Sequence, residues 1–553
     1  MRKMEKPHCQ TDEFTIFIDG CDFGDTQSHK FVFLQNIFLT MDHTRTSWNS
    51  KLGFILAASG SAIGLGNIVF FSSNAYQHGG GAFYLPYFLA LFVLGIPIMM
   101  LEFGLGATTR KSFPLALRQV AGRRAEFVGW WAIGCAAFIT MYYLAILGWA
   151  FGMMLGAFGS LFESGQTAPF TPFSEPSPEP SAMVFFFRQL ATWNPLIFTL
   201  IIWGLNLLIL KNGTSSIEKA VKIFVPLMWL CMIGLIVRGL SLEGGFQGAL
   251  YLFTPDVRGI TDPGVWRGAF SQMFFSLSLG LGALTTYASY LPKKSDLVNN
   301  AMLVSFLNCS FEYLAGLAVF SLLFVFALNP AGSTLSLSFF VIPQGINGLS
   351  ELPWIVRLTG FGFFALLVMA GLTSSLSLIE NPASALIDKL GISRNKALTL
   401  IAIPGIPGSI LFVLPFIIDP DLNGNGTLGL TLLDITDHWV FSYSLLTIGL
   451  ITALIIGWWT GAEQMRQALN QYASIKLGRW FNPFIKFVIP AILISVILSS
   501  LAGELHYENG AWTYYGSTYK LGSYWWLLAA VPTIWIGSTL TFAWVLTYKS
   551  GRV

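Results

Sequence analysis

Charged residues are scarce in this sequence. Only 11% of its 553 residues are Asp, Glu, Lys or Arg, whereas 54% are hydrophobic. Soluble domains carry about 25% charged residues. With a mean hydropathy of +0.63, the chain would expose large apolar areas in water, which excludes a soluble globular fold. We therefore predict an all-α polytopic membrane protein that resides in the lipid bilayer.

Several other features are absent. The net charge is only +3 and no basic tract occurs, so we predict no nucleic-acid partner. The sequence contains no P-loop, zinc-ligand spacing or nucleophile–base constellation, so we predict no enzyme activity. Its five cysteines include no pair in a candidate outer loop, which argues against an external disulfide framework.

The first part of the chain lacks an apolar run long enough to span a bilayer. Residues 1–44 also lack the order of charged, apolar and small residues that marks a signal peptide. We expect this extension to be disordered or to lie outside the core. Met41 would be a natural start for a transmembrane domain at residues 45–548.

The rest of the chain contains about twelve apolar segments long enough to cross a bilayer of ~30 Å. They are residues 49–72, 81–108, 127–160, 192–210, 218–239, 265–291, 298–328, 354–388, 397–417, 438–465, 484–503 and 524–548.

Basic residues gather in alternate connections between these segments. They follow segments two, four, six, eight and ten and include Arg110, Lys111, Arg118, Arg123, Arg124, Lys211, Lys219, Lys222, Lys293, Lys294, Lys389, Arg394, Lys396, Lys476, Arg479 and Lys486. Cytoplasmic loops carry such an excess of Lys and Arg. We therefore expect a multi-pass protein of the cell inner (plasma) membrane with both termini in the cytoplasm.

Glycines interrupt the first and sixth segments, which read "GSAIGLGNIVFF" and "SLSLGLGALTT". These two segments are the first members of two groups of five apolar segments. Broken helices at matching places in two such groups indicate a binding site near the bilayer midplane. Close helix packing is the alternative role for membrane glycines. A broken helix frees N–H groups that suit an anion and carbonyl oxygens that suit a hard cation.

Several motifs occur in order along the chain, namely "WNSKLGFILAASGSAIGLGNI", "GGGAFYLPY", "GIPIMMLEFGLG", "FFSLSLGLGALTTYASY" and "MAGLTSS". They resemble those of the neurotransmitter:sodium symporters, especially the bacterial LeuT-like amino-acid transporters. The resemblance covers residues 45–548. It implies a 5+5 inverted repeat with broken helices 1 and 6, which places repeat one at about 49–239, repeat two at about 265–465 and peripheral helices at about 484–548.

The resemblance also implies coupled uptake of a small amine or amino acid with sodium ions bound at two sites. Matching positions for sodium site 1 are Ala62, Asn67, Ser276 and Asn308. Those for sodium site 2 are Gly60, Ile63, Ala370, Thr373 and Ser374.

Gly64 indicates the substrate class, because the family's biogenic-amine carriers have an aspartate there. Without that carboxylate the substrate should bring its own, as an α-amino acid does. The substrate-binding residues implied by the resemblance are Ala62, Leu65, Gly66, Ile139, Tyr143, Phe275, Ser276, Ser278, Leu281, Ser374 and Leu378. This set is mostly apolar and uncharged, so we expect a neutral, hydrophobic amino acid. Leucine, methionine, valine and the aromatic residues all fit.

Two of the carboxylates within the apolar segments match positions to which the resemblance assigns a role. Glu312 falls four residues after Asn308, at a position where chloride-dependent members of the family have serine. We infer chloride independence, with Glu312 as the substitute for chloride, and hypothesise that Glu312 takes up a proton when sodium leaves. Glu102 is implied to bond freed N–H groups of the broken sixth helix.

The resemblance places Arg45 and Asp388 at the cytoplasmic gate, and Tyr143 and Phe275 as a lid over the substrate. At the outer gate, Asp437 remains, but Phe70 stands at the family's arginine position. This departure leaves a second interpretation open, a transport-impaired or channel-like membrane protein that binds an amino acid. The sequence supports no prediction of oligomeric state.

Overall fold

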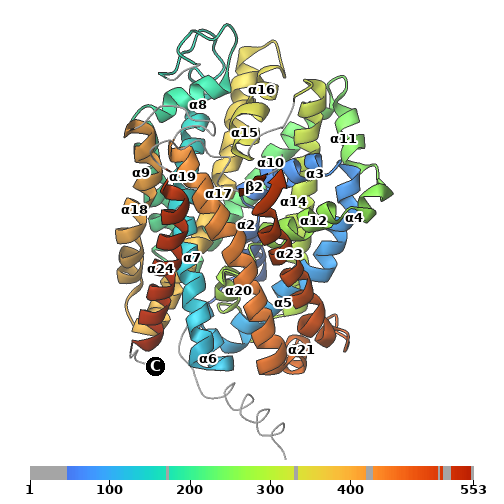
Figure 1. Ribbon diagram of the computed structural model, residues 1–553, viewed down its shortest axis with the longest axis vertical. Helices are drawn as coiled ribbons and strands as arrows, with labels where there is room; N and C mark the ends of the chain where they lie inside the picture. The colour runs from blue at the N-terminus through green and yellow to red at the C-terminus, as the bar shows by residue number, and fades with distance from the viewer. Residues whose placement is uncertain are drawn as a thin grey trace, which may run out of the picture. The chain divides into compact units, whose positions relative to one another are not determined.

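The computed structural model describes residues 46–169, 173–328, 334–418, 428–508, 511–514 and 525–549 (Figure 1). The extension 1–44 and Arg45 lie outside the described residues, so the predictions made for them stay predictions. The helices described here belong to the unit Arg45–Val553.

The first half of this unit consists of helices that coincide with the first five expected apolar segments, joined by shorter elements. In chain order they are α2 (Lys51–Ala62), α3 (Leu65–Gln77), α4 (Gly81–Ala90), η1 (Leu91–Gly95), α5 (Ile96–Thr109), α6 (Phe113–Ala121), α7 (Arg123–Gly156), α8 (Ala182–Leu190), α9 (Asn194–Leu210), α10 (Thr214–Leu240), α11 (Gly245–Phe253) and η2 (Val257–Thr261).

The second half continues the same architecture. Its elements are α12 (Pro263–Ser276), α13 (Ala283–Ala288), α14 (Leu297–Val325), α15 (Thr334–Ser336), η3 (Leu337–Val341), α16 (Ile342–Asn347), α17 (Pro353–Leu390), α18 (Arg394–Ile418), α19 (Leu428–Asp437), η4 (His438–Tyr443), α20 (Ser444–Leu454), η5 (Ile455–Gly461), α21 (Ala462–Asn470), α22 (Phe481–Pro483), η6 (Phe484–Val488), α23 (Ile489–Gly503), β1 (Leu505–Glu508), β2 (Ala511–Tyr514) and α24 (Leu527–Tyr548).

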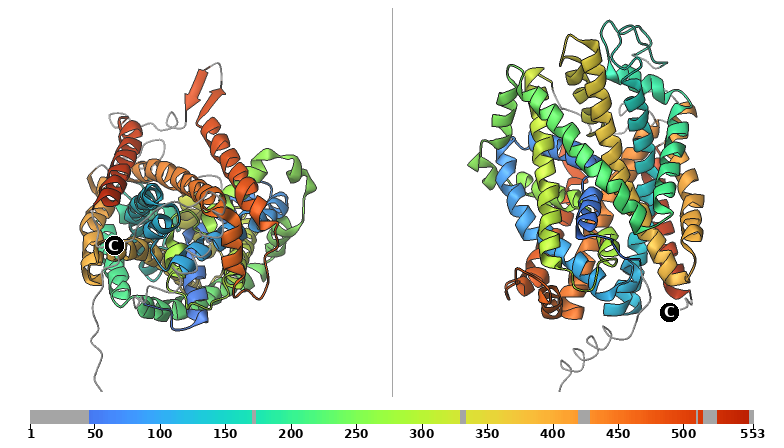
Figure 2. Two further views of the ribbon diagram at one scale, coloured as in Figure 1. Left: turned by 90° about the horizontal axis from the view of Figure 1, so that it is seen from below. Right: turned by 180° about the vertical axis from the view of Figure 1, so that it is seen from behind.

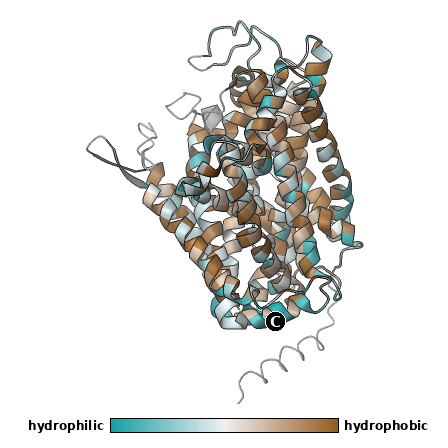
Figure 3. Ribbon diagram, turned by 90° about the vertical axis from the view of Figure 1, so that its right-hand side faces the viewer, coloured by the Kyte–Doolittle hydropathy of each residue, from teal (hydrophilic) through white to brown (hydrophobic). Residues whose placement is uncertain are grey.

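Within the described residues, nine helices are long and apolar enough to cross a membrane, or up to eleven if each of two bent pairs forms one span. The α12–α13 pair accounts for the sixth expected segment. Hydrophobic residues run along the helices, and hydrophilic ones gather at the lower end in Figure 3. The predicted helical membrane fold is confirmed, while the inverted-repeat symmetry stays a prediction.

A β-hairpin between α23 and α24 was not expected from the sequence. Strands β1 and β2 pair antiparallel, with Leu505 opposite Tyr514, and they project beyond the end of α23 (Figure 2, left). The sequence does contain a local signal, because Asn-Gly between two runs rich in aromatic residues is typical of a tight hairpin.

The first membrane segment is broken at two residues. Helix α2 ends at Ala62 and α3 begins at Leu65, and the two helices are bent by 50°. Ile63 and Gly64 have extended backbones, and the N–H of Gly64 donates to Oδ1 of Asn67 at 2.8 Å. The predicted interruption is confirmed, and a side chain of α3 satisfies one of the freed backbone groups.

The sixth segment is unwound over a longer stretch, between Ser276 and Ala283. Gly280 and Gly282 have φ angles of +89° and +77°, which glycine adopts without steric cost. The freed N–H of Gly280 donates to Oε1 of Glu102 on α5 at 2.7 Å. Glu102 therefore makes the contact with the broken helix that the resemblance implied.

Helix α5 lies against α13 with no side chain between their backbones at one point. A Cβ atom added to Gly106 would lie 2.0 Å from the carbonyl oxygen of Thr285, a distance that no real side chain tolerates. Together with the Glu102–Gly280 bond, this contact attaches α5 to both the unwound stretch and the helix after it.

We define the basic end of the bundle as the end near α6 and α21, at the bottom of Figure 1. Two buried ion pairs lie there. Lys389 Nζ is 2.7 Å from Glu126 Oε1, and both side chains are 1% exposed or less. Glu380, also fully buried, pairs with Arg394 and accepts a hydrogen bond of 2.7 Å from the Tyr290 hydroxyl.

Candidate functional site

The polar side chains predicted for sodium site 1 lie together at the two breaks. Nδ2 of Asn67 donates to Oδ1 of Asn308 at 2.8 Å and to the hydroxyl of Ser276 at 3.2 Å. Asn308 also donates to Ser276, and all three side chains are buried. Residues more than 200 positions apart in the chain thus bring neutral oxygen atoms to one point, beside the broken backbone of α2–α3.

The residues predicted for sodium site 2 also lie together, between α2 and α17. The hydroxyl of Ser374 is 3.1 Å from the carbonyl oxygen of Ser61 and 3.5 Å from that of Ile63. The Thr373 hydroxyl lies 2.8 Å from the carbonyl oxygen of Ala370. Gly60 faces Thr373, because a Cβ at Gly60 would lie 3.3 Å from the Cβ of that threonine. Hard cations such as sodium prefer oxygen donors of this kind.

A side chain at Gly64 would crowd two hydroxyl groups. An added Cβ would lie 2.9 Å from the hydroxyl oxygen of Ser374 and 3.2 Å from that of Tyr143. A carboxylate at this position would displace both hydroxyl groups. Position 64 therefore offers no carboxylate to pair with the amine of a substrate. Instead, two hydroxyl groups lie beside the unpaired backbone groups of the break.

The predicted pocket residues differ in their exposure. Ala62, Ile139, Leu281 and Leu378 are buried. Ser276 and Ser374 are buried as well, whereas the other members of the set are half-buried; these are Leu65, Gly66, Tyr143, Phe275 and Ser278. Apolar walls with a partly accessible polar centre suit an amphipathic solute of small size.

Glu312 lies one helical turn from Asn308 on α14 and has two partners that the sequence did not reveal. The hydroxyl of Tyr87 donates to Oε2 of Glu312, and Nε2 of Gln272 donates to Oε1 at 2.9 Å. Gln272 precedes Ser276 by four residues, and this spacing on one helix face was the signal that could have identified it. The carboxylate is therefore held beside the residues predicted for sodium site 1.

The two residues predicted for the outer gate do not pair with each other. Asp437 accepts a hydrogen bond of 2.7 Å from the hydroxyl of Tyr142. Phe70 is 38% exposed and its ring lies over Gly66. The lid residue Phe275 stacks against Phe441, with ring centroids 5.0 Å apart. The contacts among these residues are aromatic packing and a hydrogen bond from a neutral donor, and no ion pair is observed among them.

At the basic end, Asp388 accepts a hydrogen bond of 2.7 Å from the N–H of Ser112. Trp48 is held to the end of α13 and to the residues just after it, because its Nε1 donates to the Tyr287 carbonyl at 2.9 Å and its N–H to the Tyr290 carbonyl at 3.2 Å. Since Arg45 lies outside the described residues, its predicted pairing with Asp388 stays a prediction.

Comparisons with known proteins agree with this arrangement. The model of the sodium:neurotransmitter symporter family matches residues 45–165 and 188–547. The uncharacterized sodium-dependent transporter MJ1319 of Methanocaldococcus jannaschii is 39% identical over 499 residues, covering 86% of this chain and 94% of the relative. The sodium- and chloride-dependent GABA transporter 2 of Mus musculus is 28% identical over 501 residues, covering 83% and 80%.

Among solved structures, the crystal structure of MhsT in complex with L-phenylalanine superimposes with a TM-score of 0.70 at 30% identity, covering 82% of this chain and all of that one. The chain is a polytopic, sodium-dependent transporter, and it belongs to the sodium:neurotransmitter symporter family.

Proposed function

We propose that the protein imports a neutral, hydrophobic amino acid together with sodium by alternating access, without a requirement for chloride. The observation that carries this proposal is the pair of facing backbone breaks with Asn67, Ser276 and Asn308 between them. In this proposal the substrate carboxylate meets the freed N–H groups near Leu65 and Gly66 and completes the shell of one sodium ion.

Three further observations support this substrate class. Gly64 carries no side chain that could pair with an amine lacking its own carboxylate, and a side chain there would crowd the hydroxyl groups of Ser374 and Tyr143. The buried Ile139, Leu281 and Leu378 provide an apolar surface for a substrate side chain. The similar structure of MhsT was solved in complex with L-phenylalanine, an apolar amino acid. Aromatic and branched aliphatic amino acids are the first candidates.

The proposed chloride independence rests on Glu312. A carboxylate beside sodium site 1 supplies a negative charge of its own, whereas a serine at this position would leave that role to an anion from solution. We propose that Glu312 is protonated after sodium dissociates, which avoids leaving an uncompensated charge in the membrane interior. The basic loops favour an orientation with the basic end and both termini in the cytoplasm.

The first experiment measures binding and counterflow in proteoliposomes. We expect tritiated leucine or phenylalanine to bind in sodium but not in potassium, and sodium-dependent exchange to accompany binding. Ser276→Ala should weaken sodium-dependent binding at least about tenfold, because a ligand to a charged group is lost. The control Ser305→Ala removes another buried serine, which contacts Met99, and should bind like the wild type. Binding without sodium-dependent exchange would instead support the transport-impaired interpretation.

The second experiment replaces chloride by gluconate on both sides of the membrane. Wild-type uptake should be unchanged, and Glu312→Ser should make uptake depend on chloride. Loss of wild-type uptake in gluconate would show that Glu312 does not substitute for chloride.

A further inference from the structure

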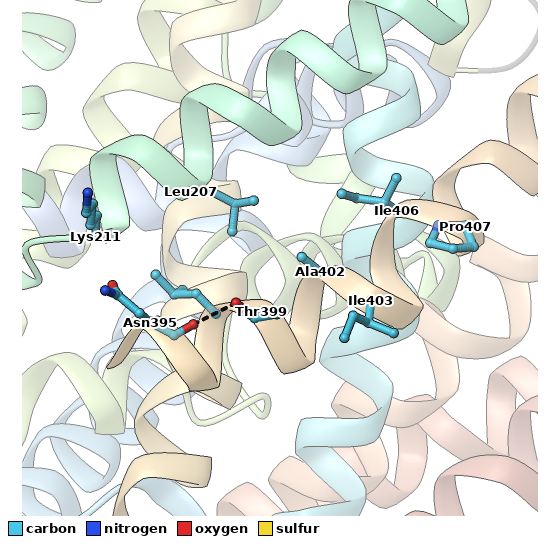
Figure 4. Close-up of a pocket in the computed structure, with 9 residues that line it drawn as sticks. Leu207, Lys211, Asn395, Thr399, Ala402, Ile403, Ile406 and Pro407 are labelled. Carbon is cyan, nitrogen blue, oxygen red and sulfur yellow. Dashed lines mark hydrogen bonds between the residues drawn. The ribbon is translucent and has the colours of Figure 1, made fainter. Parts of the chain in front are cut away.

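A groove on the surface of the bundle lies between α9 and α18. It has a volume of about 500 Å³. Its walls are mostly apolar, and the lining residues are Leu207, Lys211, Asn395, Leu398, Thr399, Ala402, Ile403, Ile406 and Pro407 (Figure 4). None of these residues belongs to the sodium or substrate sites.

Fixed contacts between α9 and α18 hold the two walls of the groove in place. A Cβ at Gly405 would lie 2.5 Å from the ring of Trp203, so the two helices touch closely there, and Nε1 of Trp203 donates to Ser409 at 2.9 Å. Toward the basic end, Nε of Arg394 donates to the carbonyl oxygen of Leu210. Between these contacts the small side chain of Ala402 leaves the space open. The groove is therefore a built feature of the helix pair.

The two ends of the groove differ in polarity. Lys211 and Asn395 lie at the same end in Figure 4, and Ile406 and Pro407 lie at the other. Lys211 is exposed, and among the described residues no carboxylate pairs with its ammonium group. The neighbouring Arg394 is already neutralised by Glu380. Lys211 therefore brings an uncompensated positive charge to the polar end of an otherwise apolar groove.

We propose that this groove binds an anionic phospholipid, with one acyl chain along Leu207, Ala402 and Ile406 and the phosphate at Lys211 and Asn395. An occupant of a groove on a membrane-facing surface must be apolar along its length. The lysine requires a negative charge at one end, and the amide of Asn395 can donate a hydrogen bond to the same group. Basic pockets between membrane helices select anionic head groups in this way. In the proposed orientation, the lipid belongs to the cytoplasmic leaflet.

The experiment compares retention of phosphatidylglycerol and phosphatidylcholine. The full chain, extracted from nanodiscs that contain equal amounts of both lipids, is examined by native mass spectrometry. We expect phosphatidylglycerol to be retained preferentially, and Lys211→Gln to reduce its affinity about fivefold. The control Lys219→Gln removes another exposed lysine, near the start of α10, and should retain lipid like the wild type. Equal retention of the two lipids, or equal losses in the two variants, would overturn the proposal.

A second variant tests the apolar wall. Ala402→Trp fills the groove and should reduce lipid retention, whereas Leu411→Trp, at a 61% exposed position of the same helix outside the groove, should not. If Ala402→Trp lowered the oligomeric mass and left lipid retention unchanged, the groove would be an interface between two copies and the lipid site would be refuted. If Ala402→Trp does not fold, the Lys211→Gln comparison still decides.

Discussion

The helices are held together by different chemistry at the two ends of the bundle. At the basic end, Glu126 pairs with Lys389 within the packed interior, and the buried Glu380 pairs with Arg394, which is 20% exposed. At the opposite end, Asp437 is held by the hydroxyl of Tyr142, and the ring of Phe275 rests on that of Phe441.

This difference bears on how each end opens. Removing one partner of a buried ion pair leaves an uncompensated charge, so these contacts tolerate little change. A neutral hydrogen bond and aromatic packing contribute about 0.5–1.5 kcal/mol each, and water replaces them readily when it enters. We therefore expect substitutions at the basic end to affect stability and those at the opposite end to affect the rate of substrate exchange.

The largest effect should come from Lys389→Met. It leaves the carboxylate of Glu126 buried without its nearest cation, and Arg118 remains only at 3.4 Å. We expect a loss of about 3–5 kcal/mol in the free energy of unfolding. A thermal unfolding curve in detergent measures this loss.

The matched control is the double variant Glu126→Gln/Lys389→Met, which removes both charges. Because a neutral pair needs no compensation, most of the lost stability should return. A double variant that is as unstable as Lys389→Met alone would mean that packing, not charge, is what this pair contributes.

A smaller effect is expected from Tyr142→Phe at the opposite end. The closed state loses the donor to Asp437, whereas water solvates this carboxylate in the open state, so opening becomes easier. Leaving a buried acceptor without a donor costs about 1–3 kcal/mol. We expect a value near the lower limit for the closed state, because Asp437 is only half-buried.

The measurement is the rate at which labelled substrate dissociates, which should rise about fivefold for 1 kcal/mol. Tyr251→Phe is a suitable control, because Tyr251 donates to the Tyr76 carbonyl at 3.5 Å, away from this gate. An unchanged rate in Tyr142→Phe would show that the Tyr142–Asp437 bond does not restrain the outer gate.

The smallest effect should come from Phe70→Arg, which introduces a cation at the opposite end. Position 70 is 38% exposed, so an ion pair with Asp437 would contribute about 0.2–1 kcal/mol. Substrate release should slow up to about fivefold, whereas Phe70→Met should leave it unchanged. Identical affinity and turnover in the arginine variant would mean that this position has lost its gating role.

Much of the fold could be predicted from local sequence signals. Apolar runs of span length correspond to the observed helices, and Gly64 and Gly280 mark breaks that the structure contains. These signals are local, because the length of an apolar run and the conformational freedom of a glycine are both properties of short stretches of sequence. The β-hairpin was missed although its Asn-Gly dipeptide is equally local.

Contacts between distant segments were harder to predict. The clustering of Asn67 with Asn308 could be expected only from a family resemblance, since 241 positions separate them. The partners of Glu312 and Asp437 were not identified, because Tyr87 and Tyr142 lie in apolar runs where tyrosine has no distinctive pattern. Helix packing, not local sequence, decides which polar groups meet.

The close contact between Gly106 and Thr285 restricts how the molecule can change shape. The Glu102–Gly280 hydrogen bond and the contact of Gly106 with Thr285 hold α5 against both the unwound stretch and α13. We therefore expect these three parts to move as one block when the basic end opens. A bulky residue at position 106 would be expected to arrest the cycle without touching ion or substrate.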